Sequence, residues 1–211
     1  MKLFVVRHGE TSFNAEKRYL GALDPPLNAR GIEQAHHLRA TLSPELDLVV
    51  CSPLLRARQT ASVVCKDRPL ALSVDDAFRE RNVGVFEGLT QNEARLGHPA
   101  MWQKNVTRDW RNAPDGGETI AEVVTRVNTG LQALQHAHAG KTVLLVAHGF
   151  VAKTVRAICL ADFSDFFEWQ LDNGAICTLQ FAADALTSDF RPDTPPRSWP
   201  QTPGQFSAGS A

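Results

Sequence analysis

The sequence predicts an α/β fold, a three-layer α/β/α sandwich with a mostly parallel central sheet. Three apolar runs, at residues 3–6, 46–51 and 142–146, are rich in valine and mostly lack polar alternation. Such runs are typical of strands covered on both faces. Helical patterns lie between them, and strands alternating with helices favour a sheet with helices on both sides. The chain has 211 residues, enough for one domain with a sizeable core.

Four segments have the periodicity of helices. Over residues 119–138, apolar side chains recur at 3.6-residue spacing from Ile120 to Leu134. Residues 28–42 place four apolar side chains on one side: Ile32, Ala35, Leu38 and Leu42. Pro53 behind Ser52 predicts a helix over 53–64, with Ser52 as its N-cap. The fourth helix is expected over 150–160.

The remaining segments are less regular. Residues 70–74 predict a weaker strand, and residues 176–181 alternate in part, which predicts a strand near a sheet edge. Residues 90–115 hold Trp102 and Trp110 without a long apolar period, and we expect an excursion that acts as a lid. We therefore expect one domain over residues 1–185. A proline-rich tail follows over residues 186–211, in which Trp199 and Phe206 either dock on the body or belong to an extended arm, the favoured interpretation.

The composition of the chain argues against several classes of protein. The chain has 22 Lys plus Arg against 23 Asp plus Glu, a net charge of −1. This balance argues against non-specific binding to nucleic acid or to a membrane surface. The four cysteines form no C-x-x-C pair, and the first apolar run is too short for a signal peptide. We expect a cytoplasmic protein, either a monomer or a homodimer.

Basic side chains follow the predicted central strands. In an open α/β sheet, ligands bind outside the carboxyl ends of the strands. Two arginines and two histidines at such ends would form a site for a dianion, because a guanidinium donates two parallel hydrogen bonds and keeps its charge. A neutral histidine is also a nucleophile toward phosphorus. The residues concerned are Arg7, His8, Arg56 and His148, with Gly9 and Gly149 after the histidines.

Transfer of a phosphoryl group from an ester also needs an acid, which protonates the leaving group. Residues 78–88 offer two carboxyl groups for this role, Glu80 and Glu87. Position in the sequence alone leaves both open.

Five motifs in this order resemble those of the histidine phosphatase superfamily, the phosphoglycerate mutase-like family, over about residues 3–180. They are Arg7-His8-Gly9-Glu10-Thr11 with Asn14, Ser52-x-x-x-Arg56-Ala-x-Gln59-Thr60, Glu80 ahead of Glu87-Gly88, Gly116-Gly117-Glu118-Thr119, and Ala147-His148-Gly149. The resemblance implies a nucleophilic His8 that becomes phosphohistidine, and a clamp of Arg7, Arg56 and His148 on the phosphoryl oxygens. It implies that Glu80 is the proton donor and that Asn14 adds a hydrogen bond. Gly9, Thr11 and Gly149 are the other expected substrate contacts. It implies no metal and no organic cofactor.

Other interpretations of single residues stay open. Two histidines with a carboxylate are potential zinc ligands, but the nearby arginines would repel a dication. Glu118 is either a first-turn charge on the helix dipole or the partner of an arginine. Four apolar residues form either a wall for the leaving group or the underside of the lid, the favoured interpretation: Phe86, Met101, Trp102 and Trp110.

The expected function is a metal-independent phosphatase of the histidine acid type that hydrolyses small phosphate monoesters. A cofactor-dependent phosphoglycerate mutase is the alternative, since the excursion holds Arg95, Lys104, Arg108 and Arg111 as potential contacts for a second anion. Only 68 residues separate Glu80 from His148, whereas the family's mutases are longer in this region. A non-catalytic module that binds a phosphate ligand is the third possibility.

Overall fold

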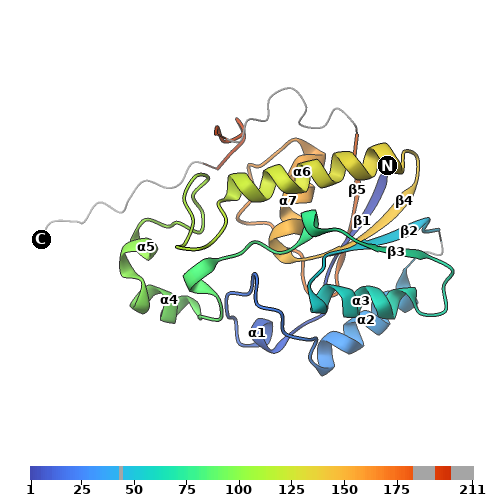
Figure 1. The fold of residues 1–211 in the computed structure, drawn as a ribbon, viewed down its shortest axis with the longest axis horizontal. Helices are drawn as coiled ribbons and strands as arrows, with labels where there is room; N and C mark the ends of the chain where they lie inside the picture. The colour runs from blue at the N-terminus through green and yellow to red at the C-terminus, as the bar shows by residue number, and fades with distance from the viewer. Residues whose placement is uncertain (43–44, 183–192, 201–211) are drawn as a thin grey trace, which may run out of the picture.

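A five-stranded sheet forms the centre of the computed structural model, which describes residues 1–42, 45–182 and 193–200 (Figure 1). The strands are β1 (Lys2–Arg7), β2 (Leu48–Cys51), β3 (Ala71–Val74), β4 (Thr142–Ala147) and β5 (Ile176–Gln180). Their spatial order is β3-β2-β4-β1-β5. Neighbouring strands are parallel except β5, which runs antiparallel to β1. The predicted mostly parallel sheet and the predicted edge strand are both confirmed.

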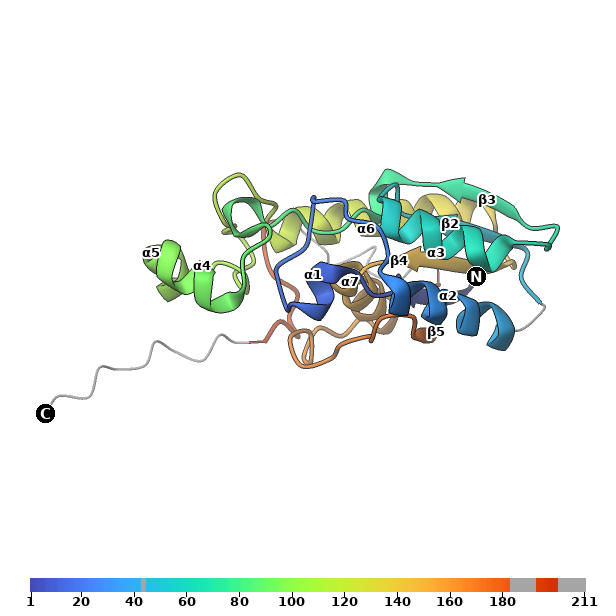
Figure 2. The same ribbon diagram turned by 90° about the horizontal axis from the view of Figure 1, so that it is seen from below.

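Helices cover both faces of the sheet, as Figures 1 and 2 show. One face carries α2 (Ala29–Thr41) and α3 (Leu55–Cys65), and the other carries α6 (Ile120–Ala137) and α7 (Gly149–Leu160). Shorter elements occupy the connections: α1 (Ser12–Ala15), α4 (Gln91–Gly97) and α5 (Pro99–Gln103), with single turns over Asp76–Phe78 and Gly84–Phe86. The predicted three-layer sandwich is confirmed.

The apolar runs are continuous because alternate side chains enter two different cores. In β1, Leu3 and Val5 pack with α6 and α7, whereas Val6 packs with α2 and α3. In β4, Leu144 belongs to the second cluster and Leu145 to the first. Successive side chains of a strand point to opposite faces, so a sheet covered on both faces needs an apolar residue at every position.

Two local predictions are wrong. Helix α3 begins at Leu55 rather than Pro53, and Ser52 is not its N-cap: the N-cap position is Leu54, which makes no side-chain cap bond. Ile32 is 44% exposed, because the helix periodicity carries it off the buried side of α2. The weaker strand predicted over residues 70–74 is confirmed as β3, an edge strand whose four residues are all exposed.

The excursion over residues 90–115 carries α4 and α5 at the end of the molecule away from the strands (Figures 1 and 2). A small apolar cluster holds it together, in which Phe86, Ala94 and Val106 are buried against Met101 and Trp102. Phe86, Met101 and Trp102 therefore form the underside of the excursion, which is the interpretation that the sequence favoured. Trp110 instead joins the main core.

The described part of the tail is docked on the body, against the favoured extended arm. Trp199 packs on four aromatic rings, those of Trp110, Phe163, Phe166 and Phe167, at centroid distances of 4.8, 6.1, 5.2 and 5.3 Å. The Phe163 amide also donates to Ser198 Oγ at 2.9 Å. Phe206 and the proposed boundary at 185/186 lie outside the described residues. Within the described ranges, no helix is both long and apolar enough to cross a membrane.

Candidate active site

The ends of three neighbouring parallel strands bring the predicted residues together. Arg7 ends β1 and pairs in register with Ala147 at the end of β4, while Cys51 of β2 pairs with Val146. The residue after each strand is therefore His8, His148 or Ser52. Because the three strand ends are level, these residues lie at one edge of the sheet, as expected from the topology.

His8 is held as a neutral imidazole with one nitrogen available. The residue is 2% exposed, and its Nδ1 lies 2.7 Å from the Gly9 carbonyl oxygen. A carbonyl only accepts, so Nδ1 carries the proton and Nε2 keeps its lone pair. Burial, followed by the charges of Arg56 and Arg7, holds the pKa of His8 well below its usual value. The arrangement is that of a nucleophile ready at neutral pH.

The second histidine is oriented by Ser52. His148 is fully buried, and its Nε2 lies 2.7 Å from Ser52 Oγ. That oxygen also accepts from the Leu54 amide at 3.3 Å, and Ser52 either donates its hydroxyl proton to Nε2 or accepts a proton from it. Burial and the charge of Arg56 hold the pKa of His148 well below normal. In the tautomer in which Ser52 donates to Nε2, the neutral ring offers Nδ1–H as a donor to a ligand.

Both arginines are anchored by carbonyl oxygens. Arg56 has no exposed surface and donates from Nη1 to Leu23 O at 2.7 Å and from Nη2 to Gly21 O at 2.9 Å. Arg7 donates from Nη1 to Leu171 O at 2.9 Å. Burial lowers the pKa of each guanidinium, and the Glu80 carboxyl partly opposes this effect. The carbonyl bonds fix where each guanidinium lies.

Three buried polar atoms of this group lack a hydrogen-bond partner among the described residues: Arg7 Nε, Arg56 Nε and His148 Nδ1. Buried donors are normally satisfied, because an unmade hydrogen bond costs ~1–3 kcal/mol. The imidazoles of His8 and His148 lie with their ring centroids 5.1 Å apart. Donors of this number beside a nucleophilic nitrogen match a tetrahedral oxyanion such as phosphate.

Glu80 lies beside this group at the start of α7. Its Oε2 accepts from the Phe150 amide at 3.1 Å and its Oε1 from the Arg81 amide at 2.9 Å. Its charge acts on both Arg7 and Arg56. The carboxyl group is therefore fixed close to the donors, where a leaving-group oxygen would need a proton. Glu87 accepts from amides of Gly21, Ala22, Leu23 and Val83, in the loop that holds Arg56, and its charge acts on Arg56.

The other predicted contacts build the loop after β1. Thr11 and Asn14 form the capping box of α1, in which Asn14 Oδ1 accepts from the amide and hydroxyl of Thr11 at 3.1 and 3.0 Å. The Thr11 hydroxyl is therefore bonded within the loop. The side-chain nitrogen of Asn14 takes no part in the capping box. Asn173 Nδ2, which the sequence analysis missed, donates to the His8 carbonyl at 3.0 Å.

Glycine stands at positions 9 and 149 for different structural reasons. A Cβ on Gly9 would lie 2.3 Å from the Gly31 carbonyl oxygen, so the loop packs against the backbone of α2. Its amide donates to Thr60 Oγ1 at 3.1 Å, which explains Thr60 of the second motif. A Cβ on Gly149 would be 3.4 Å from Arg7 Cζ. Gly149 therefore leaves room for the arginine.

Glu118 is the partner of arginines rather than only a first-turn charge. Its carboxylate accepts from Arg126 Nε at 2.9 Å and Nη2 at 3.0 Å, and from Arg79 Nη2 at 3.1 Å. Arg126 in turn donates to the carbonyls of Ala77, Arg79 and Glu80. The pair binds the segment that carries Glu80 to α6. Arg126 was missed because it lies inside a helix, away from any strand end.

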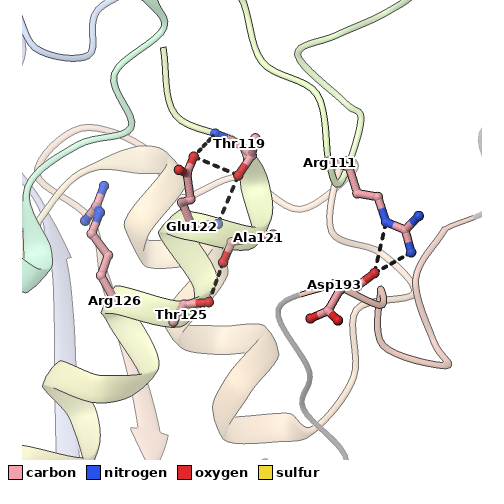
Figure 3. A pocket seen from close by; sticks show the side chains of 7 residues that line it. All are labelled: Arg111, Thr119, Ala121, Glu122, Thr125, Arg126 and Asp193. Carbon is pink, nitrogen blue, oxygen red and sulfur yellow. Dashed lines mark hydrogen bonds between the residues drawn. The ribbon is translucent and has the colours of Figure 1, made fainter. Parts of the chain in front are cut away.

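Two of the cavities in the described structure bear on the site. The larger, about 780 Å³, is lined by Arg111, Thr119, Ala121, Glu122, Thr125, Arg126 and Asp193 (Figure 3) and contains none of the predicted site residues. The smaller, about 260 Å³, includes Glu80 in its wall. We assign the smaller cavity to the active site, because Glu80 joins it to the buried donors. Among the described residues, no group of three or more His, Cys, Asp or Glu side chains is placed to hold a metal ion.

Known proteins are similar to this chain in both sequence and fold. Phosphoglycerate mutase-like protein 4 of Arabidopsis thaliana is 35% identical over 73% of this chain and 69% of its own length. Phosphoserine phosphatase 1 of Hydrogenobacter thermophilus is 32% identical over 83% and 84%. The crystal structure of the alpha-ribazole phosphatase from Shigella flexneri superposes with a TM-score of 0.76 at 29% identity, over 85% of this chain and 90% of that one. The sequence model of the histidine phosphatase superfamily (branch 1) matches residues 3–193, and the chain belongs to this family.

Proposed function

We propose that the protein is a phosphatase that hydrolyses small phosphate monoesters through a phosphohistidine on His8. The observation that carries the proposal is that Nε2 of His8 lies beside three buried nitrogens that have no hydrogen-bond partner in the described part of the chain: Arg7 Nε, Arg56 Nε and His148 Nδ1. Phosphatases among the relatives and solved structures support it. The two open alternatives differ in chemistry: a mutase returns the phosphoryl group to an organic acceptor, and a binding module transfers none.

In the first step, His8 Nε2 attacks phosphorus and the bond from phosphorus to the ester oxygen breaks. Glu80, in its protonated form, gives its proton to the leaving oxygen, so that a neutral alcohol departs. The cationic and hydrogen-bond donors stabilise the charge on the three phosphoryl oxygens. Positioned donors take the part that Mg²⁺ plays in kinases, and we propose that the reaction needs no metal.

In the second step, water attacks the phosphohistidine. The Glu80 carboxylate, which lost its proton in the first step, now takes one from the water. The bond between nitrogen and phosphorus breaks, and the electron pair returns to His8 Nε2. Inorganic phosphate leaves, and both side chains regain their starting states.

We also propose a cellular compartment, a partner and an oligomeric state for the enzyme. All four cysteines are free thiols, which supports a reducing compartment such as the cytoplasm. The partner is a small-molecule phosphomonoester. We propose a monomer or a homodimer, and the exposed edge strand β5 is the surface through which two copies would pair.

The test is trapping of the intermediate with two variants and p-nitrophenyl phosphate labelled with ³²P. Wild-type enzyme quenched within milliseconds should carry label that is labile to acid and stable to base, and His8→Ala should carry none. Glu80→Gln should accumulate more label than wild type. A good leaving group departs without an acid, whereas hydrolysis of the intermediate still needs the base.

Three outcomes would contradict the proposal. Label that persists in His8→Ala would place the nucleophile elsewhere. If a chelator abolished the activity and zinc or magnesium restored it, the metal-independent mechanism would be wrong. Isomerisation of 3-phosphoglycerate faster than its hydrolysis would favour the mutase.

A further inference from the structure

The cavity beside Glu80 carries more positive charge than phosphate transfer requires. Of its lining residues, three are basic and one, Glu80, is acidic. The basic residues are Arg81, Arg108 and Lys153, and the wall also includes three aromatic rings, those of Tyr19, Phe150 and Phe167. None of the three cations belongs to the group around His8. The excess charge lies where the leaving group of the ester would be, on the side of the proton donor.

Lys153 is the least expected of these cations, because it is 7% exposed in the middle of α7. Its Nζ lies 5.9 Å from the ring centroid of Phe150 and 5.6 Å from that of Phe166. Among the described residues it makes no ion pair. Burial lowers the pKa of Lys153 to about 8, although Glu80 partly opposes the effect. A lysine is almost never buried unless it is paired, so an anion that binds the cavity would supply the missing partner.

The two arginines share this wall. Arg81 is 2% exposed and donates from Nε to Glu118 O and from Nη1 to Thr107 O, while its buried Nη2 has no partner in the part of the chain that the structure describes. Arg108 lies on the exposed side, with its guanidinium over the ring of Phe167 at 5.0 Å. Arg81 thus adds a buried, unsatisfied donor to the charge of Lys153, and Arg108 adds charge at the cavity mouth.

Helix α7 carries both Gly149, which lies against Arg7, and Lys153, four residues further on and on the same side of the helix. Four residues rise ~6 Å along a helix. For a substrate whose phosphate is bound at Arg7, a second anion two or three carbon atoms away would lie within reach of Lys153.

We propose that Lys153 is a specificity-determining residue that selects phosphate esters whose leaving group carries a carboxylate. The proposal rests on the phosphatase function proposed above and names its substrate class. A single carboxylate fits better than a second phosphate, because it brings less negative charge into a wall that also holds Glu80. The cavity of about 260 Å³ is also small for a nucleoside.

The experiment uses matched esters that differ in the carboxylate alone. In the first pair, 3-phosphoglycerate has a carboxylate where glycerol 3-phosphate has a hydroxymethyl group. In the second pair, O-phosphoserine has a carboxylate where O-phosphoethanolamine has a hydrogen atom. We expect kcat/KM of the wild type to favour the carboxylate ester of each pair at least tenfold. Lys153→Met, which keeps the length and apolar stem, should reduce this ratio to near one. Lys153→Arg should retain part of it.

Lys104→Met is the matched control, because Lys104 is exposed, lies in the excursion and does not line the cavity. It should keep the wild-type ratio. The rate on p-nitrophenyl phosphate and the circular dichroism spectrum of each variant report whether the phosphate site and the fold survive. A ratio taken within one variant is insensitive to the amount of folded enzyme.

The inference is overturned if the wild type hydrolyses both members of each pair equally, or if its preference survives in Lys153→Met. It is also overturned if p-nitrophenyl phosphate is hydrolysed and neither carboxylate ester is. Failure of the proposed function looks different. In that case the wild type hydrolyses none of these esters, including p-nitrophenyl phosphate, and no label is trapped on His8.

Discussion

Two buried imidazoles, those of His8 and His148, lie beside two guanidiniums, and this arrangement keeps both rings neutral. Their hydrogen-bond partners then give the two rings different roles. The Gly9 carbonyl leaves Nε2 of His8 with its lone pair, as the proposed nucleophile requires, and the bond of Ser52 to Nε2 of His148 leaves Nδ1 of that ring open to a ligand. The residue types came from the sequence. The interpretation of Ser52 as a helix cap was wrong, although its position directly after β2 matches that of the two histidines after their strands.

The neutral histidines predict how stability depends on pH. Burial and Arg56 hold the pKa of both below the ~6.5 of the unfolded chain. The unfolded state therefore binds more protons as the pH falls, so stability is present in full above about 6.5 and decreases below it. Each histidine contributes ~1.4 kcal/mol per pH unit, and the pair about 3 kcal/mol between pH 7.5 and 5.5. Urea unfolding at both pH values measures this difference.

The control separates these histidines from other titrating groups. A double variant, His8→Asn with His148→Asn, should lose markedly less stability over the same interval than the wild type. His36→Gln with His37→Gln should behave as the wild type, because both side chains are exposed on α2. Equal losses in all three proteins would show that the buried pair does not titrate as described.

At the scale of elements, α6 positions the proton donor without touching substrate. Glu118 precedes the helix, Arg126 lies two turns further on, and together they hold the carbonyls of Ala77, Arg79 and Glu80. Both side chains are about 85% buried, at 14% and 15% exposed. The periodicity of residues 119–138 predicted the helix but not this positioning role, because the ion pair depends on how the segment before Glu80 packs against α6.

Arg126→Met should therefore act as a variant of a positioning residue. We expect a loss of about 3 kcal/mol in the free energy of unfolding, since the partly buried carboxylate of Glu118 loses the arginine that binds both its oxygens and keeps only the half-exposed Arg79. We also expect kcat on an alkyl phosphate to fall roughly tenfold more than kcat on p-nitrophenyl phosphate, because only the alkyl leaving group needs a well-placed acid.

Arg95→Met is the control for charge, because Arg95 is exposed on α4 and, within the described ranges, its side chain bonds to Asn92 alone. It should leave both rates and the stability near wild type. If Arg126→Met lowered both rates equally, Arg126 would be structural only.

At the scale of the whole molecule, the tail closes over the core that backs the substrate cavity. Trp199 packs on Trp110 from the excursion and on Phe167, which lines the cavity that also holds Lys153. The docked segment thus links two parts of the chain that are about 60 residues apart. A proline-rich composition favoured an extended arm, because local sequence does not reveal an aromatic cluster assembled from Trp110 and the 163–167 segment.

Trp199→Ala should lower the melting temperature. Truncation of a buried tryptophan costs ~3–5 kcal/mol, and the partial exposure of Trp199 puts the expected loss at about 2 kcal/mol. For a chain of this size that corresponds to a fall of ~4–8 °C, measurable by calorimetry. Arg197→Ala, an exposed neighbour in the same segment, should change it little. An unchanged melting temperature in Trp199→Ala would mean that the tail is not docked in solution.

Local patterns predicted the layers and the central strands, because burial on both faces of a sheet gives uninterrupted apolar runs. The rule of strand ends predicted that Arg7, His8 and His148 lie together, whereas Glu80 was preferred to Glu87 from the order of the family's motifs. The contacts of Ser52, the Glu118–Arg126 pair, the docked Trp199 and the buried Lys153 could not be predicted, because they depend on which distant backbone or side-chain atoms come within hydrogen-bonding or packing distance. Local sequence patterns do not specify those long-range contacts, which form only when the chain packs.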